Sequence, residues 1–170
     1  MGADKSEKGT SLISDDASRE LLAALAQWSG GMSPQALGGA WWNVLSRLAV
    51  APGRQAQIAQ TAIQKTIALA QFTGGALKGQ GEPVAPQAEG TPYANRFADP
   101  AWARFPFNVL AQSFITASEL ARTAVQGVPG TTAAAANVVD FTVREGLELL
   151  APDNYLPTNP QLLEQTRVES

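Results

Sequence analysis

Apolar residues recur at helical spacing along most of this chain, and no alternating apolar and polar run is long enough to indicate a strand. Glycine and proline interrupt the pattern at Gly30-Gly31, at 51–53, at Gly74-Gly75 and at 127–130. A helix with one apolar face has to bury that face against another element. The sequence therefore predicts an all-α protein, an irregular domain of about five to six helices.

The expected helices are bounded by start and stop signals. Ser33-Pro34 and Asn159-Pro160 each pair a capping residue with a proline at the first helical position. The segments are 15–28, 34–50, 54–72, 107–125, 132–150 and a last helix from 160 onward. The expected buried faces of the third, fourth and fifth of these segments are Ile58, Ala59, Ala62, Ile63, Thr66, Ile67 and Ala70, then Phe107, Leu110, Phe114, Ala117, Ala121 and Val125, then Ala135, Val138, Val139, Thr142, Leu149 and Leu150.

Proline and glycine also divide the chain. Residues 79–95 carry three of each and few apolar side chains, which favours a flexible linker, with 79–92 as its extent. Residues 1–16 are expected to be a disordered lead-in, 17–78 a helical N-terminal extension, and 93–166 a second helical domain.

Composition excludes several classes of function. The chain has no cysteine and no histidine, which excludes cysteine nucleophiles, Ser-His-Asp triads and ordinary zinc sites. Twelve basic and 15 acidic residues give a net charge of −3, with no basic stripe for nucleic acid. Residues 21–46 are uncharged, but glycine, proline and Asn43 interrupt them, so we expect no transmembrane segment. The N-terminus lacks the apolar core of a signal peptide, so we expect a cytoplasmic protein.

Two features resemble chemical sites weakly. Glu145 and Glu148 share a helix face, which suits an acid/base pair or a magnesium site, but Arg144 with Glu148 also fits an exposed ion pair, which we favour. The stretch GGALKGQG at 74–81 fits neither phosphate-loop spacing and is better explained as a helix stop. We therefore expect no catalytic residues, no metal and no cofactor.

Trp41 and Trp42 are adjacent, so they lie about 100° apart on a helix. Trp41 falls on the stripe of Leu37, Val44 and Leu48 and is expected in the core. Trp42 is a candidate contact with a partner or surface, or a half-buried side chain at the edge of the bundle.

The stretch RFADPAWARFPF at 96–107, called the aromatic block below, gathers four aromatic side chains in a chain that has few. We expect Phe97, Trp102, Phe105 and Phe107 to pack the end of the linker onto the helices. Pro100 and Pro106 would fix the turn into the following helix.

The aromatic block resembles the pattern RF-x-D-x-x-W-x-x-x-P-F of the class I polyhydroxyalkanoate synthases (poly-beta-hydroxybutyrate polymerases). A second stretch, FTVREGLELLAPDNYLPTNPQLLEQT at 141–166, is similar to a later motif of that family at compatible spacing. Ala151, Glu148 and Tyr155 depart from the usual Ser, Asp and Phe. The residues that carry the resemblance and for which we expect structural or docking roles are Arg96, Phe97, Asp99, Trp102, Phe105, Pro106, Phe107, Arg144, Pro152, Asn154, Thr158, Asn159 and Pro160.

The resemblance implies the N-terminal helical domain of an acyltransferase that polymerises 3-hydroxyacyl-CoA on a cysteine thiolate. The family's α/β-hydrolase domain and its Cys-Asp-His triad lie after the second motif and are absent here, so we expect this chain to be inactive alone. The implied partners are the catalytic domain, in cis or in trans, a second copy, granule-coating phasins and the polyester granule. We keep one alternative, a stand-alone phasin-like granule-surface protein, motivated by the amphipathic segments 54–72 and 132–150. An autonomous enzyme is disfavoured because no positioned base is visible.

Overall fold

A computed structural model describes residues 31–79 and 83–168, and every regular element in that part of the chain is helical. The all-α prediction is confirmed. The helix expected over 15–28 lies outside the described residues. The elements in chain order are α2 (Pro34–Ala49), α3 (Pro52–Lys78), the 3-10 turn η1 (Pro100–Ala103), α4 (Phe107–Val125), α5 (Ala133–Leu150), the 3-10 turns η2 (Pro152–Asn154) and η3 (Leu156–Thr158), and α6 (Pro160–Val168).

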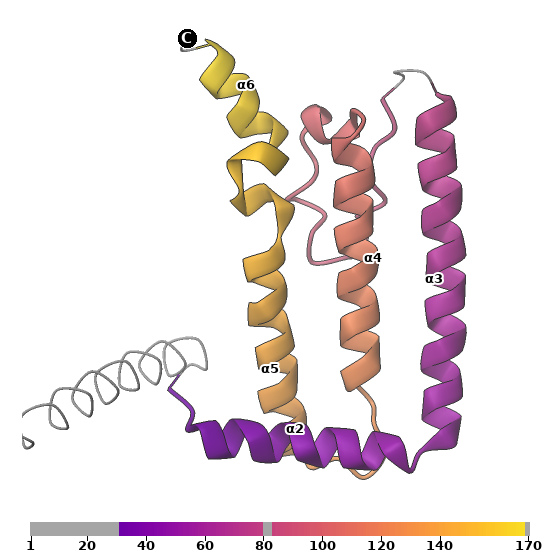
Figure 1. Cartoon of the computed structure of the whole chain (residues 1–170), viewed down its shortest axis with the longest axis vertical. Coiled ribbons are helices and arrows are strands. Elements are labelled where there is room, and N and C mark those ends of the chain that lie inside the picture. Colours follow the sequence, from indigo (N-terminus) through magenta and orange to yellow (C-terminus); the bar gives the residue numbers. More distant parts are fainter. Residues whose placement is uncertain (1–30, 80–82, 169–170) are drawn as a thin grey trace, which may run out of the picture.

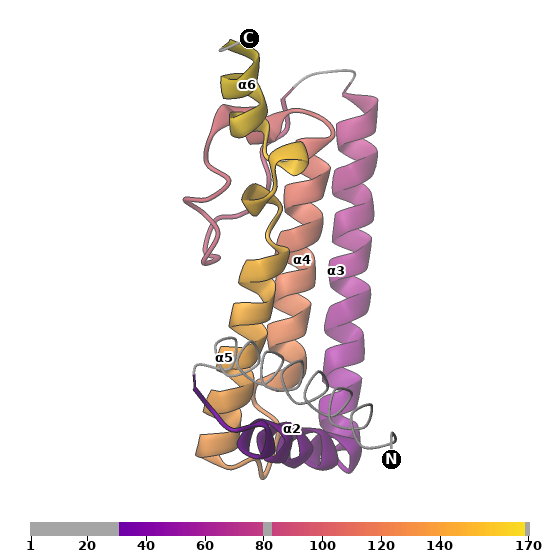
Figure 2. The ribbon, with the colours of Figure 1, turned by 60° about the vertical axis from the view of Figure 1, so that its left-hand side comes forward.

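Three long helices stand side by side in the order α5, α4, α3, and α2 crosses their lower ends (Figures 1 and 2). α2 is held there by Val44, which is fully buried and packs with Val139 and Ala135 of α5 and with Val128. Trp41 is half-buried against this cluster, as its stripe predicts. α6 continues beyond the upper end of α5, so α2 and α6 lie at opposite ends of the molecule.

The predicted helix starts are confirmed. The Ser33 hydroxyl accepts a hydrogen bond from the Ala36 N–H at 3.2 Å, and the Asn159 side chain accepts one from the Gln161 N–H at 3.0 Å. The end expected at Gly74-Gly75 is wrong, because α3 runs through both glycines to Lys78. Glycine weakens a helix interior without ending it, and Ala76 is buried after the pair.

α3 buries only part of the face that its apolar pattern predicts: Ile58 and Ala62 are half-buried, and the other five expected residues are exposed. The face toward α4 is mostly half-buried, and Lys65 in it pairs with Glu119 of α4 at 2.6 Å. Ile63 and Ile67, expected in the core, are 61% and 52% exposed. α3 stands at the edge of the layer, so it has a neighbouring helix on one side only (Figure 1). The residues on its buried side are Arg54, Ile58, Thr61, Lys65, Leu69, Phe72 and Ala76.

Residues 83–92, in the segment for which composition favours a flexible linker, run along α4 without regular structure and turn at 89–92. The Val84 N–H donates to the Ala103 carbonyl at 2.8 Å, and the Gln87 N–H donates to the Gln112 side chain of α4 at 2.7 Å. Ala88 is buried in the main core cluster. Each proline removes one backbone N–H donor from this segment. Side chains of α4 form hydrogen bonds with backbone N–H and carbonyl groups of its other residues.

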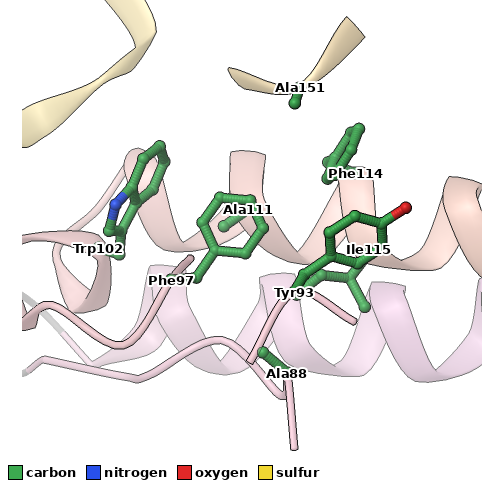
Figure 3. Packing of buried hydrophobic residues seen from close by; sticks show 8 residues of the cluster. All are labelled: Ala88, Tyr93, Phe97, Trp102, Ala111, Phe114, Ile115 and Ala151. Carbon is green, nitrogen blue, oxygen red and sulfur yellow. The ribbon is translucent and has the colours of Figure 1, made fainter. Parts of the chain in front are cut away.

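The main core is an aromatic cluster between this segment, α4 and the end of α5 (Figure 3). Phe97 contacts Trp102 edge to face at a centroid distance of 4.9 Å, and Tyr93 contacts Phe114 of α4 at 5.0 Å. Phe97 and Phe114 are 6.1 Å apart, so the two pairs form one cluster. Edge-to-face pairs stabilise beyond the area that they bury.

We predict that Trp102→Ala lowers the free energy of unfolding by about 3 to 5 kcal/mol, because Trp102 is fully buried and its removal leaves a cavity. Thermal and urea unfolding followed by circular dichroism measure the loss. The matched control is Phe105→Ala in the same block, where the side chain is 54% exposed and the loss is expected below about 1 kcal/mol. Equal losses for the two variants would contradict the anchoring role of Trp102.

Candidate functional site

Asp99 caps the turn at the centre of the aromatic block. Its carboxylate accepts a hydrogen bond from the Ala101 N–H at 2.8 Å, and Pro100 occupies the first position of η1. The turn that follows buries Ala101, Trp102 and Ala103. A capped turn of four residues is therefore enough to direct the indole into the core.

The second half of the block leads into α4. Phe107 opens α4 and is half-buried against the cluster, with its ring 6.3 Å from that of Trp102. Pro106 directly precedes the helix, in the turn where we expect it. The expectation that Phe105 also packs onto the helices is wrong, since it is 54% exposed. Phe105 lies in the bend between η1 and α4, between Trp102 and Phe107, which take the inward positions.

Arg96 joins the block to the end of α5. Its guanidinium contacts Glu148 at 2.6 Å and Asp153 at 3.2 Å. Burial lowers the pKa of Arg96, but the hydrogen bond to Glu148 and the nearby Asp153 carboxylate outweigh it and raise the pKa above its ordinary value. The side chains are partly buried, so this ion pair is less screened than an exposed one. Arg96 thus links two segments that are far apart in the sequence.

The expected pairing of Arg144 with Glu148 does not form. Arg144 lies 3.8 Å from Glu145 and over the ring of Phe141, and its side chain is 57% exposed. Glu148 is taken by Arg96. No group of three or more acidic side chains that could hold a metal ion occurs among the described residues. The Glu145 and Glu148 face is therefore explained by two ion pairs.

The segment after α5 is held by its own side chains. The Thr158 hydroxyl donates to the Pro152 carbonyl at 2.6 Å, and the Asn159 amide donates to the Asp153 carbonyl at 2.7 Å. Asn154 donates to the Glu148 carbonyl at 2.5 Å, near the end of α5. Pro152, Asn159 and Pro160 are buried. These bonds fix the path from α5 to α6.

Four exposed apolar side chains lie in the last turn of α5 and in the segment that follows it, and we call them the platform: Leu149, Leu150, Tyr155 and Leu156. Their exposed fractions are 56%, 71%, 50% and 50%. The Tyr155 hydroxyl donates to the Leu149 carbonyl at 2.5 Å, which holds the turn against the helix end. The expectation that Leu149 and Leu150 are buried is wrong, because the buried residues here are Leu147 and Ala151, four positions apart, and Leu149 and Leu150 lie off that face. Exposed large apolar side chains that gather on one surface are typical of interaction sites.

The structure thus gathers the predicted site residues at one end of the molecule, with Trp42 outside the group. Trp42 is 74% exposed on α2, which crosses the opposite end (Figure 1). Sequence reasoning missed Tyr93, Asp153 and Leu156. Tyr93 precedes the block and could have been added to it, whereas the Arg96–Asp153 contact spans too many residues for any local signal.

Comparison with known proteins agrees with this grouping. Residues 93–170 match the family model described as the poly-beta-hydroxybutyrate polymerase (PhaC) N-terminus. The chain is 31% identical over 91 residues to the poly(3-hydroxyalkanoate) polymerase of Methylorubrum extorquens. Residues 93–170 are therefore similar to the N-terminal region of polyhydroxyalkanoate synthases.

The match to that synthase covers 53% of this chain and 15% of the relative, so the chain spans a small part of the relative's length. No solved structure matches the chain. The aromatic block, Arg144 and the residues from Pro152 to Pro160 all lie within the residues that match the family model, while Trp42 and α3 precede them. Within residues 31–79 and 83–168, none of the helices combines the length and hydropathy needed to cross a bilayer.

We predict that Arg96→Met lowers the free energy of unfolding by about 1 to 3 kcal/mol, because it leaves the largely buried Asp153 carboxylate without its cation. The matched control, Arg144→Met, removes an exposed pair and should cost less than about 0.5 kcal/mol. Urea unfolding measures both. Adding Asp153→Asn to Arg96→Met should restore part of the loss, and no restoration would argue against the charge explanation.

Proposed function

We propose that this chain acts as the docking region of a polyhydroxyalkanoate synthase. It supports polymerisation of 3-hydroxyacyl-CoA into storage polyester by binding the catalytic α/β-hydrolase domain, in cis or in trans. The observation that carries the proposal is the platform, whose four exposed apolar side chains lie within the residues that match the family model.

The platform is suited to docking because it is already ordered. Binding usually costs free energy for fixing loops and side chains, and a surface fixed beforehand avoids much of this cost. The Asn154, Thr158 and Asn159 side chains hold the backbone that carries Tyr155 and Leu156. Burying the four exposed apolar side chains would then favour the complex.

The thiolate and the base of the reaction would come from the catalytic domain, because this chain has neither cysteine nor histidine. Its own contribution would be to position and stabilise that domain. We further propose that the region takes part in dimerisation, in contact with phasins and in attachment to polyester granules in the cytoplasm. These roles are those that the resemblance to the synthase family implies.

The test expresses the tagged 170-residue chain in polyester-accumulating source cells, purifies it through the tag, and measures the synthase activity that is purified with it. We expect the wild-type chain to recover CoA release from 3-hydroxybutyryl-CoA and to show none when purified alone. Leu150→Asp combined with Leu156→Asp should lower the recovered activity at least tenfold, since charges would be desolvated in the interface. Val50→Asp, at a 77% exposed position directly after α2, is the control and should recover full activity.

Undiminished recovery with the platform double variant would contradict docking through the platform. Recovery of polyester granules without any CoA release would favour the alternative, a stand-alone phasin-like granule-surface protein. An immunoblot of source cells also separates the two, because a band far above 17.8 kDa indicates docking in cis.

A further inference from the structure

The most apolar face of α3 points away from the protein. Ile63, Ile67 and Leu77 are 61%, 52% and 59% exposed, and none of the described elements packs over them. α3 forms the outer edge of the helical layer in both views, with its other side against α4 (Figures 1 and 2). The outward face, called the α3 seam below, consists of Ala56, Ala59, Ile63, Thr66, Ile67, Ala70, Gly74 and Leu77.

The α3 seam has the spacing of a helix–helix contact. From Ala56 to Leu77 its members recur every three or four residues, with Thr66 and Ile67 adjacent, so they stay on one face. No charged residue lies within it, and its flanks are mainly glutamine. The cations of α3 are engaged elsewhere or terminal: Arg54 donates to two carbonyls at the end of α4, Lys65 pairs with Glu119, and Lys78 closes the helix.

We infer that the α3 seam binds the α3 seam of a second copy of this chain. A helix that lies on a lipid-like surface typically combines bulky apolar residues with lysine and arginine along its polar face. The seam instead alternates large residues with alanine and glycine, which allow a second helix to approach closely, and its flanks are neutral. These features favour another helix over a lipid or polyester surface.

The order of large and small residues makes the seam complementary to itself in the antiparallel sense. A two-fold axis between Thr66 and Ile67 places Leu77 of one copy against Ala56 of the other, and Ile63 against Ala70. The hollow beside Ile67, Ala70 and Gly74 would receive the partner's Ile63. A parallel pair would instead stack large on large and bring the two Lys78 side chains together.

The size of the seam indicates a weak dimer. A helix of 27 residues is about 40 Å long and about 10 Å wide, which gives a contact strip of about 400 Å² on each copy. Stable interfaces bury about 1,200 to 2,000 Å² in total. The association should therefore depend on concentration and should not be needed for folding.

This inference names a surface for the dimerisation proposed above, but it does not depend on the docking role. α3 precedes the residues that match the synthase family. The test uses the purified 170-residue chain without a catalytic partner, so its failure would leave the platform proposal standing.

Sedimentation velocity from about 10 μM to about 1 mM should show a shift from 17.8 kDa toward twice that mass. Ile67→Glu should keep the chain at the monomer mass throughout, because the axis would bring two carboxylates together. Its thermal unfolding should match wild type, since the side chain points away from α4. Trp42→Glu, a more exposed position on α2, is the control and should dimerise normally.

A wild-type chain that stays monomeric at every concentration would overturn the inference. The inference would also be overturned if Trp42→Glu abolished dimerisation and Ile67→Glu did not. Binding of monomeric chain to phosphatidylcholine vesicles or polyester particles that Ile67→Glu abolishes would likewise overturn it, in favour of a surface contact.

The absence of cysteine makes the orientation directly testable. Under oxidation, a mixture of Ala56→Cys and Leu77→Cys chains should form the mixed disulfide several-fold faster than either chain links to itself. Faster self-linking of each single variant would indicate a parallel pair and overturn the antiparallel arrangement.

Discussion

The burial of Trp102 is the contact on which the rest of this structure depends. The indole is fully enclosed, and its neighbours Phe97 and Phe107 come from either side of it in the sequence. Through Phe97 the cluster reaches Phe114 in the middle helix and Tyr93 directly after the segment 83–92. One buried side chain therefore connects a segment without regular structure to the helical layer. Since most side chains of this chain are small, few other residues could fill that volume.

The few charged side chains of this chain also stabilise the fold, through ion pairs and hydrogen bonds between segments. Arg96 bridges Glu148 and Asp153, Lys65 bridges Glu119, and Arg54 binds carbonyls at the end of α4. Each of these contacts joins segments that are remote in sequence, so each selects one packing arrangement among several that would bury similar apolar area. Together with the side-chain bonds of Asn154, Thr158 and Asn159, they order the apolar platform before any partner arrives.

The two apolar surfaces that stay exposed differ in kind. The platform is short and irregular, and it lies on the part of the chain that matches the synthase family, which suits a specific globular partner. The α3 seam is long, regular and flanked by neutral residues, which suits another helix. The two surfaces are carried by different elements, one by the end of α5 and one by the edge helix, so their contacts can vary independently.

The sequence by itself determined the helical class, the caps at Ser33 and Asn159, and Phe97, Trp102 and Phe107 in and against the aromatic core, because helical period, capping residues and aromatic clustering are local signals. It also pointed to the synthase family through Arg96, Trp102 and Asn159 with their neighbours. Only the tertiary structure decided which helix faces are buried. α3 presents its more apolar face to solvent, Leu149 and Leu150 lie off the face that Leu147 and Ala151 bury, and Glu148 pairs with Arg96 rather than with Arg144. The physical reason is that burial depends on how many neighbours an element has, and an edge helix has one neighbouring side whatever its own pattern favours.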